Sequence, residues 1–190
     1  DENVLAVRRG NHVRIVKAWH ETNTVQAVRE FISLFRELSL IPGQVYGDAG
    51  GLGGPMLDLF AEEGFHVRRI HNVSPAREPE TYTNLGSEAW FYVANEITLS
   101  RINLSDNPSI EPQLFSQLTS RPRARDARQR LRTLPKEDMA KLGLKSPDRA
   151  DALVGCVYCG SYLTGAISAS TMRDGVSLAP TDFHVKTEIF

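Results

Sequence analysis

The chain is organised around one stretch, Val45-Tyr46-Gly47-Asp48-Ala49-Gly50-Gly51-Leu52-Gly53-Gly54-Pro55. An apolar pair leads into it, and an amphipathic run from Met56 to Phe60 leaves it, which predicts a strand, a tight glycine-rich turn and a helix. In an α/β sheet, a turn of this kind lies at the carboxyl end of a strand, where ligands usually bind. The carboxylate of Asp48 is therefore a candidate ligand-binding group at a strand end.

The glycines of this turn do not match two familiar phosphate-binding motifs. A P-loop requires Gly-x-x-x-x-Gly-Lys-Ser/Thr, and no lysine follows these glycines. A dinucleotide-binding turn requires Gly-x-Gly-x-x-Gly, but counting from Gly51 and Gly53 places Met56 at the third glycine position. A bare carboxylate repels phosphate unless a metal ion stands between them. The alternative is a flexible connection in which Asp48 is solvated.

Length and composition describe one ordinary globular domain. The chain has 190 residues and a mass of 21.1 kDa, with 41% hydrophobic and 24% charged residues and a net charge of -1. Its two cysteines, Cys156 and Cys159, lie in an apolar run, so we expect small buried side chains and no disulfide framework. No signal peptide and no run of ~18 apolar residues occurs, so we expect no membrane-spanning segment.

Hydrophobic periodicity predicts an α/β fold with a mixed sheet, in which helical crossovers connect parallel strands. Residues 170–190 show little periodicity, so we expect a domain over 1–169 and a C-terminal tail over 170–190, with a strand folded back on the domain as the alternative for its last residues. The expected elements are a β-hairpin over 4–19, a helix over 24–39, a strand ending at 48, a helix over 55–63, a strand over 65–70, and helices over 87–97, 111–118, 136–142 and 146–163.

A second informative stretch runs from Lys145 to Val154. Ser146 suits the N-cap of a helix and Asp148 suits its first turn. Asp151 lies three residues further on, on the same helix face, about one turn inside a helix that is apolar nearly all round. A buried carboxylate there needs a partner, which can be an arginine, a hydrogen-bond network or a metal ion.

Asp48 at a strand end and Asp151 on a late helix together are typical of a carboxylate-bridged Mg²⁺ site. Mg²⁺ takes hard oxygen ligands, keeps several waters, and binds through one or two carboxylates together with substrate phosphate. Two such ions can activate water and stabilise the leaving oxygen in phosphodiester hydrolysis. We predict Asp48 and Asp151 as catalytic residues and metal ligands, with Asp148 as a further candidate metal ligand.

The sequence also resembles a known family at both stretches. Val45-Tyr46-Gly47-Asp48-Ala49-Gly50-Gly51-Leu52-Gly53 looks like the strand-end motif of the large terminase subunits of tailed bacteriophages, and Ser146-Pro147-Asp148-Arg149-Ala150-Asp151-Ala152-Leu153 looks like their closing helix motif. The residues Tyr82-x-Asn84 and Lys136-x-Asp138-Met139 also lie where that family would place them. The resemblance covers roughly residues 1–165 and is most specific in the second motif.

The resemblance implies the C-terminal nuclease domain of a terminase. Its expected fold is RNase H-like, a mixed β-sheet flanked by helices on both faces. Its expected activity is Mg²⁺-dependent endonuclease cleavage of concatemeric double-stranded DNA by two metal ions, with Mn²⁺ as a substitute, during viral genome packaging in the host cell cytoplasm. Asp48 would be the second catalytic acid, Asp151 the third, and Asp148 an auxiliary ligand or a structural acid.

The same resemblance implies features outside these motifs. The family's first acid lies on a strand that precedes the hairpin, so we expect that strand and its acid to lie upstream of Asp1. We therefore expect weak Mg²⁺ binding, somewhat better Mn²⁺ binding and feeble cleavage. The portal protein, docked through the tail, and the small terminase subunit are the expected protein partners. Alternatives are an RNase H-like nuclease or resolvase outside DNA packaging, and a non-catalytic docking module.

One charged segment is a candidate DNA-binding surface. Six arginines crowd between positions 121 and 132, opposed only by Asp126. Such a cluster can neutralise several phosphates, which makes binding strongly salt-dependent. A solvated charged loop is the alternative. The candidate DNA-binding residues are Arg121, Arg123, Arg125 and Arg128.

Overall fold

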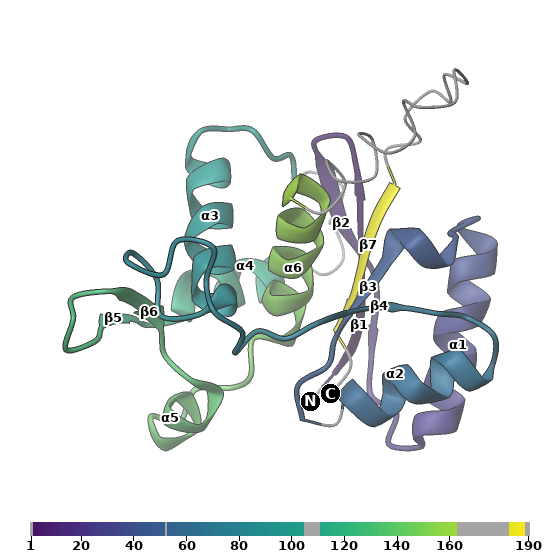
Figure 1. The fold of residues 1–190 in the computed structure, drawn as a ribbon. Coiled ribbons are helices and arrows are strands. Elements are labelled where there is room, and N and C mark those ends of the chain that lie inside the picture. Colours follow the sequence, from purple (N-terminus) through teal and green to yellow (C-terminus); the bar gives the residue numbers. More distant parts are fainter. Residues whose placement is uncertain (1, 52, 105–110, 163–182, 189–190) are drawn as a thin grey trace.

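The computed structural model describes residues 2–51, 53–104, 111–162 and 183–188. Its centre is a five-stranded mixed sheet in the order β2-β1-β7-β3-β4 (Figure 1). β1 pairs antiparallel with both β2 and β7, whereas β3 pairs parallel with β7 and β4. These strands are β1 (Asn3–Arg9), β2 (His12–Trp19), β3 (Val45–Asp48), β4 (Arg68–Ile70) and β7 (Phe183–Glu188).

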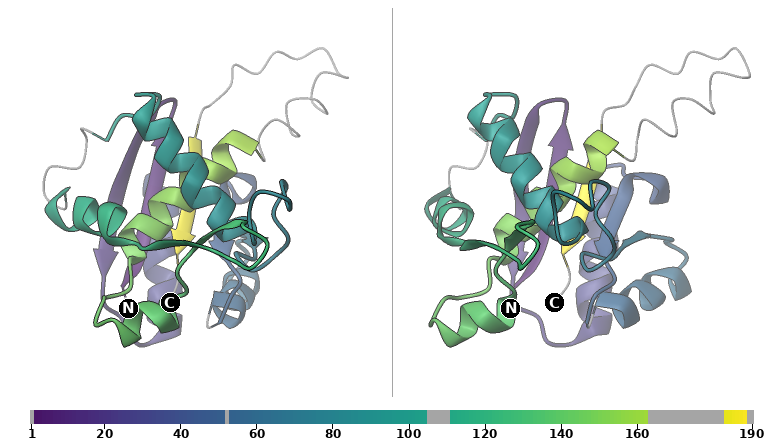
Figure 2. Two further views of the ribbon diagram at one scale, coloured as in Figure 1. Left: turned by 90° about the vertical axis from the view of Figure 1, so that its left-hand side faces the viewer. Right: turned by 60° about the vertical axis from the view of Figure 1, so that its left-hand side comes forward.

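Helices cover both faces of this sheet (Figures 1 and 2). α1 (Thr24–Glu37) and α2 (Gly53–Glu62) pack on one face of the sheet. Between these two helices in the chain, the short 3-10 helix η1 (Pro42–Gln44) leads into β3. On the other face, α6 (Asp148–Tyr162) lies against the sheet and carries α3 (Leu85–Thr98) and α4 (Glu111–Ser120). A small antiparallel hairpin, β5 (Arg123–Arg125) and β6 (Leu131–Thr133), and the short helix α5 (Lys136–Lys141) complete the described chain.

The alternation of side chains along β1 divides the core into two layers. Val4 and Ala6 are fully buried on the α6 face, whereas Leu5 and Val7 are buried on the α1 and α2 face. A strand with both faces buried lies in a sheet that is covered on two sides. This agrees with the mixed sheet flanked by helices that we expected. No helix within the described residues is long and apolar enough to cross a bilayer.

Most expected elements occur close to their predicted positions. α1 is capped by the Asn23 side chain, which accepts from two backbone N–H groups, and it ends at Glu37, before the left-handed Ser39 (φ 57°). α6 is buried along nearly its whole length, and Cys156 and Cys159 are free, buried thiols within it, as expected. Between α4 and α5, residues 123–125 and 131–133 pair as the antiparallel strands β5 and β6.

β7 differs from the expected tail. Residues 183–188 lie between β1 and β3, the middle position of the sheet, which corresponds to the alternative of a strand folded back on the domain. The predicted boundary at 169/170 lies outside the described residues, and so do residues 170–182 and 189–190.

Candidate active site

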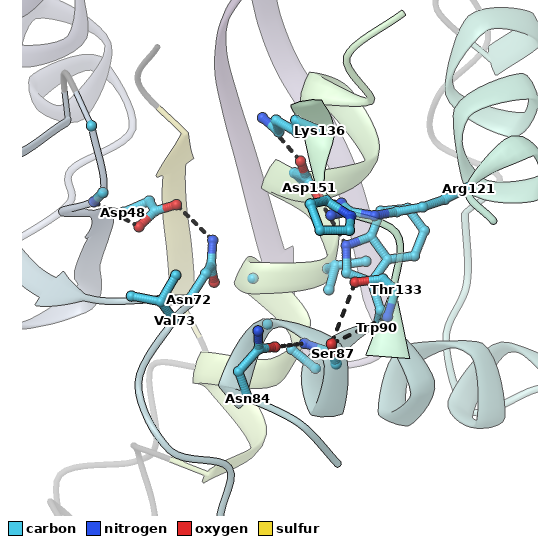
Figure 3. A pocket seen from close by; sticks show the side chains of 17 residues that line it. Asp48, Asn72, Val73, Asn84, Ser87, Trp90, Arg121, Thr133, Lys136 and Asp151 are labelled. Atoms are coloured by element: carbon cyan, nitrogen blue, oxygen red, sulfur yellow. Dashed lines mark hydrogen bonds and ion pairs between the residues drawn. The ribbon is translucent and has the colours of Figure 1, made fainter. Parts of the chain in front are cut away.

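A pocket of about 470 Å³ opens at the carboxyl end of β3, between that strand and α6 (Figure 3). Its walls come from segments far apart in the sequence: the glycine turn, the loop after β4, the start of α3, the residue after α4, the β6–α5 connection and α6. The pocket therefore forms only when the tertiary structure assembles. Its polar lining includes Asp48, Asn72, Asn84, Ser87, Arg121, Thr133, Lys136 and Asp151.

Asp48 ends β3 and is held by neutral hydrogen-bond donors. The Gly50 backbone N–H donates to Oδ1 at 3.0 Å, and the Asn72 amide donates to Oδ2 at 2.6 Å. The residue is only 8% exposed, at the edge of the pocket. Close packing of β3 against α2 also favours glycine at the preceding position, since a Cβ on Gly47 would lie 2.5 Å from Cδ2 of Leu57. The strand, turn and helix predicted from the sequence thus fix one carboxylate at the strand end.

Asn72 is positioned by the start of α3. It follows β4 by two residues, and Ile70 of β4 pairs in register with Asp48 of β3. The Gly86 N–H donates to the Asn72 carbonyl at 2.8 Å, and a Cβ on Gly86 would lie 3.1 Å from the Asn72 Cβ. This close approach holds the Asn72 loop against α3 and orients the amide toward Asp48.

The rest of this loop is fixed by the buried carboxylate of Glu88. Glu88 accepts from the backbone N–H groups of Arg77 and Glu78, at 2.6 and 3.3 Å, and from the hydroxyl of Tyr158, at 2.8 Å. Burial and the hydrogen bond to Glu88 raise the pKa of Tyr158, so this hydroxyl stays protonated as a donor. Glu88 does not line the pocket, and its contacts give it a structural role.

Asp151 lies on the opposite wall of the pocket from Asp48 and is held by cations (Figure 3). The Trp90 indole N–H donates to Oδ1 at 2.8 Å, and the Arg121 guanidinium also donates to Oδ1. The Lys136 ammonium lies 3.1 Å from Oδ2. Asp151 is 6% exposed, so these groups supply the compensation that a buried carboxylate requires. Of the three partners that the sequence left open, arginine and a hydrogen-bond network are both present.

Arg121 is held between Asp151 and an aromatic ring. Its guanidinium carbon lies 4.7 Å from the centre of the Trp90 ring, and its side chain is 11% exposed. Trp90 thus binds the Asp151 carboxylate through its N–H and Arg121 through its ring face, an arrangement that favours a fixed guanidinium. Arg121 is the one predicted DNA-binding residue that the structure separates from the others.

Asp148 is not one of the residues that line the pocket, and it ties two segments together. It accepts from the Glu2 backbone N–H at 2.8 Å and from the Ser146 hydroxyl, and Lys136 lies 3.4 Å from it. Beside it, the Arg149 guanidinium binds Glu2 through two hydrogen bonds of 2.8 and 2.7 Å. These contacts fasten the start of α6 to the start of β1. They match the structural alternative for Asp148, while its role as an auxiliary metal ligand stays a prediction.

The other predicted arginines lie on the β5–β6 hairpin, which begins beside the pocket. Arg123 and Arg125 of β5 and Arg128 in the turn are exposed. Asp126 accepts from the backbone N–H groups at positions 128 and 130, which makes the turn. Arg121 and Thr133, at the two ends of the hairpin, both line the pocket. The hairpin therefore carries its exposed arginines outward from the pocket.

Two side chains that bind the pocket carboxylates, Asn72 and Trp90, were missed from the sequence. Asn72 carried a usable signal, because the carboxyl ends of neighbouring parallel strands meet at one edge of a sheet. Trp90 carried none, since an aromatic residue on an amphipathic helix is normally part of the core. Lys136 had been noted only as part of the family resemblance, and its contact with Asp151 could not be read from the spacing.

The carboxylates fit a divalent cation in part. Their hard oxygen atoms are the ligands that Mg²⁺, Mn²⁺ and Ca²⁺ accept. Within the described ranges, however, no three His, Cys, Asp or Glu side chains gather closely enough to hold a metal ion. Asp48 and Asp151 share one pocket, and an ammonium now contacts one oxygen of Asp151. A metal there would be held by these two side chains and would compete with Lys136.

Comparison with known proteins identifies the architecture. No protein-family model and no curated protein sequence matches the chain. Solved structures of the nuclease domain of the large terminase subunit of bacterial virus Sf6 do match. A variant with manganese and beta-thujaplicinol aligns with a TM-score of 0.70 and 19% identity, covering 84% of this chain and 83% of that one.

Two further structures of that domain agree. A variant with calcium gives a TM-score of 0.67 and the domain itself 0.66, each at 19% identity over 84% of this chain and 83% of theirs. A likeness at this level of identity establishes the arrangement of the chain in space. This protein therefore has the RNase H-like fold of the nuclease domain of a bacteriophage large terminase subunit.

Proposed function

We propose that this chain is the nuclease domain of a viral DNA-packaging terminase, which hydrolyses phosphodiester bonds of concatemeric double-stranded DNA. The observation that carries the proposal is the placement of Asp48 and Asp151 on facing walls of one pocket in a terminase nuclease fold. A carboxylate at a strand end and another in the first turn of a packed helix can supply oxygen ligands for metal-assisted phosphodiester hydrolysis.

The proposed cofactor is Mg²⁺, with Mn²⁺ as a substitute, and two ions. Three of the matching Sf6 nuclease structures carry manganese or calcium, which supports a divalent cation for this fold. Asp48 and Asp151 would hold the metal, with Asp148 as an auxiliary ligand. When bound, the metal supplies Lewis-acid activation of water and neutralises charge on the phosphate.

The protein's own contribution is orientation and positive charge. Asn72 and the Gly50 N–H fix the Asp48 carboxylate, while Trp90 and Arg121 fix Asp151. Both carboxylates are buried, so their positions are set before substrate arrives. The pocket also holds the guanidinium of Arg121 and the ammonium of Lys136, which favour an anionic phosphodiester.

We propose that the β5–β6 hairpin binds the DNA backbone. Arg123, Arg125 and Arg128 are exposed on a structure that leads away from the pocket, so a duplex entering the pocket would pass them. Replacing these three with alanine should reduce the salt dependence of DNA binding by about 0.9 log–log units per lost phosphate contact. An unchanged slope would leave them as a solvated charged loop.

The cleavage experiment uses supercoiled plasmid and Mn²⁺, because relaxation by a single nick detects feeble activity. The wild-type chain should nick plasmid only with the metal present and should bind Mn²⁺ in calorimetry. Asp48→Asn should lose both properties, whereas Asp58→Asn, an exposed acid of α2 paired with Arg69, should keep both. A wild-type chain with neither property favours the non-catalytic docking module.

The protein partners follow from the same proposal. In a packaging terminase, the portal protein and the small terminase subunit would be the binding partners, in the host cell cytoplasm. Labelled chain should bind purified portal and small subunit in solution. Binding to neither would favour an RNase H-like nuclease or resolvase outside packaging.

A further inference from the structure

The two oxygen atoms of the Asp151 carboxylate have different kinds of partner. Oδ1 accepts from the Trp90 indole at 2.8 Å and from the Arg121 guanidinium. Oδ2 lies 3.1 Å from the Lys136 ammonium. All four residues line the same pocket, and Figure 3 shows the carboxylate between the lysine on one side and the arginine and tryptophan on the other.

The partners of Oδ1 are fixed. The Arg121 side chain is 11% exposed and lies against the Trp90 ring, 4.7 Å from its centre. Its Nε is buried and has no hydrogen-bond partner within the described part of the chain, so the guanidinium is held by stacking and by the ion pair. Moving it would uncover a buried cation and a large aromatic surface at the same time.

The partner of Oδ2 can move. The Lys136 side chain is 32% exposed, and Lys136 is the first residue of α5, directly after Pro135. An ammonium on a four-carbon stem is a point charge that can turn toward water without a change in the backbone. Lys136 also lies 3.4 Å from Asp148, so it bridges the two acids at the start of α6.

The charges of this cluster are balanced before any metal binds. Asp148 and Asp151 are opposed by Arg121 and Lys136. A divalent cation that reached Asp151 would meet the ammonium at close range, and like charges at a few ångströms in a partly buried pocket repel strongly. Either the metal stays out or the lysine leaves.

We propose that Lys136 is an exchangeable cation that occupies Asp151 Oδ2 until a divalent metal displaces it, and that the released ammonium then binds a DNA phosphate in the same pocket. The inference rests on the proposed nuclease function. It assigns Lys136 two roles: the residue delays metal entry in the absence of DNA, and it contacts a DNA phosphate once metal is present. Arg121 stays with Asp151 throughout.

The first test is Mn²⁺ affinity, measured by calorimetry on the full chain without DNA. Lys136→Met keeps the apolar stem and removes the charge, so it should bind Mn²⁺ about fivefold more tightly, the factor that corresponds to loss of a competing, partly exposed ion pair. Lys136→Arg keeps a cation and should stay close to wild type. Lys141→Met is the matched control, because Lys141 lies on the same helix, is 75% exposed and pairs with Asp138.

The second test measures DNA binding as a function of salt, with Ca²⁺ and, separately, with EDTA. In Ca²⁺, Lys136→Met should lower the log–log slope by about 0.9, one phosphate contact. In EDTA, wild type and Lys136→Met should have the same slope, because the lysine is then held by Asp151. A lysine with a purely structural role would change neither slope, and a permanent DNA contact would change both.

The outcomes separate this inference from the proposed function. Tighter Mn²⁺ binding by Lys136→Met, together with a slope change confined to Ca²⁺, supports the exchange. If wild type binds Mn²⁺ and Lys136→Met binds it equally or more weakly, the exchange is wrong and the nuclease proposal stands. If neither chain binds Mn²⁺, both are wrong. A slope that changes equally in Ca²⁺ and EDTA also overturns the exchange.

Discussion

The Asp151→Asn and Asp48→Asn variants should differ sharply in stability, although we expect both to lose metal binding. Each removes one buried carboxylate from the same pocket. Asp48 is bound by neutral donors, whereas Asp151 is bound by the cations Arg121 and Lys136. From the sequence alone, relief of repulsion between acids could have stabilised either variant. The structure shows that the charge of Asp151 is already compensated, so its removal leaves cations unpaired.

The size of the effect follows from burial. Removing one partner of a buried ion pair costs about 3–5 kcal/mol, because the other charge stays buried without compensation. Asparagine can still accept the Trp90 hydrogen bond, and Lys136 is partly exposed and can turn to water, so we expect about 2–4 kcal/mol for Asp151→Asn. At ~2–4 °C per kcal/mol for a chain of this size, its melting temperature should fall by about 5–15 °C. For Asp48→Asn, a lost charge-assisted bond and a relieved desolvation cost offset each other to within about 1 kcal/mol.

The assay is thermal and urea unfolding in EDTA, so that residual metal does not stabilise the wild type. The Arg121→Met/Asp151→Asn double variant tests the cause, since removing both charges should recover part of the loss. An Asp151→Asn chain at least as stable as wild type would refute the reasoning, and so would a loss that the double variant does not reduce. In either case the ion pair would not account for the burial of Asp151.

Three further predictions concern the scaffold. The hydrogen bond from Arg149 lowers the pKa of Glu2 below its usual 4.5. The contribution of this pair to stability is therefore present above pH 4.5 and is lost as the pH falls through the lower pKa of the folded state. Glu2→Gln should be less stable than wild type at neutral pH, and its melting temperature should fall less steeply as the pH is lowered. Deleting residues 183–190 should collapse the melting temperature, because β7 is the middle strand; an unchanged value would return the segment to a docking tail. Gly47→Ala should cost about 1–3 kcal/mol in urea unfolding, since its Cβ would press on the buried Leu57; no loss would show that the core yields there.

Much of the fold could be predicted because it depends on local pattern. The glycine turn after an apolar strand, the capped amphipathic helix over 24–37 and the buried closing helix all appear where periodicity and capping residues place them. Asp48 and Asp151 were selected for the same reason. A carboxylate at a strand end or inside an apolar helix is conspicuous in the sequence, since burying it needs compensation.

The identity of the compensating partners could not be predicted. Arg121 was grouped with the exposed arginines because they are close in sequence, but its side chain turns to Asp151, thirty residues away, and to Trp90 on another helix. The local sequence indicates that a charged side chain such as Asp151 is buried. Which distant side chain meets it depends on how α3, α4 and α6 pack.

The strands show the same difference between what the sequence indicates and what only the tertiary structure shows. The apolar run at the start of residues 4–9 indicated a strand, but the weak pattern of residues 183–188 gave no reason to place them in the middle of the sheet. Pairing between strands is made by backbone groups that every residue carries, so it leaves little trace in side-chain sequence. The sequence by itself determined the strand–turn–helix unit, the closing helix and the two acids; only the tertiary structure decided which strand lies beside β3 and which cations hold Asp151, because both are contacts between segments that the chain keeps far apart.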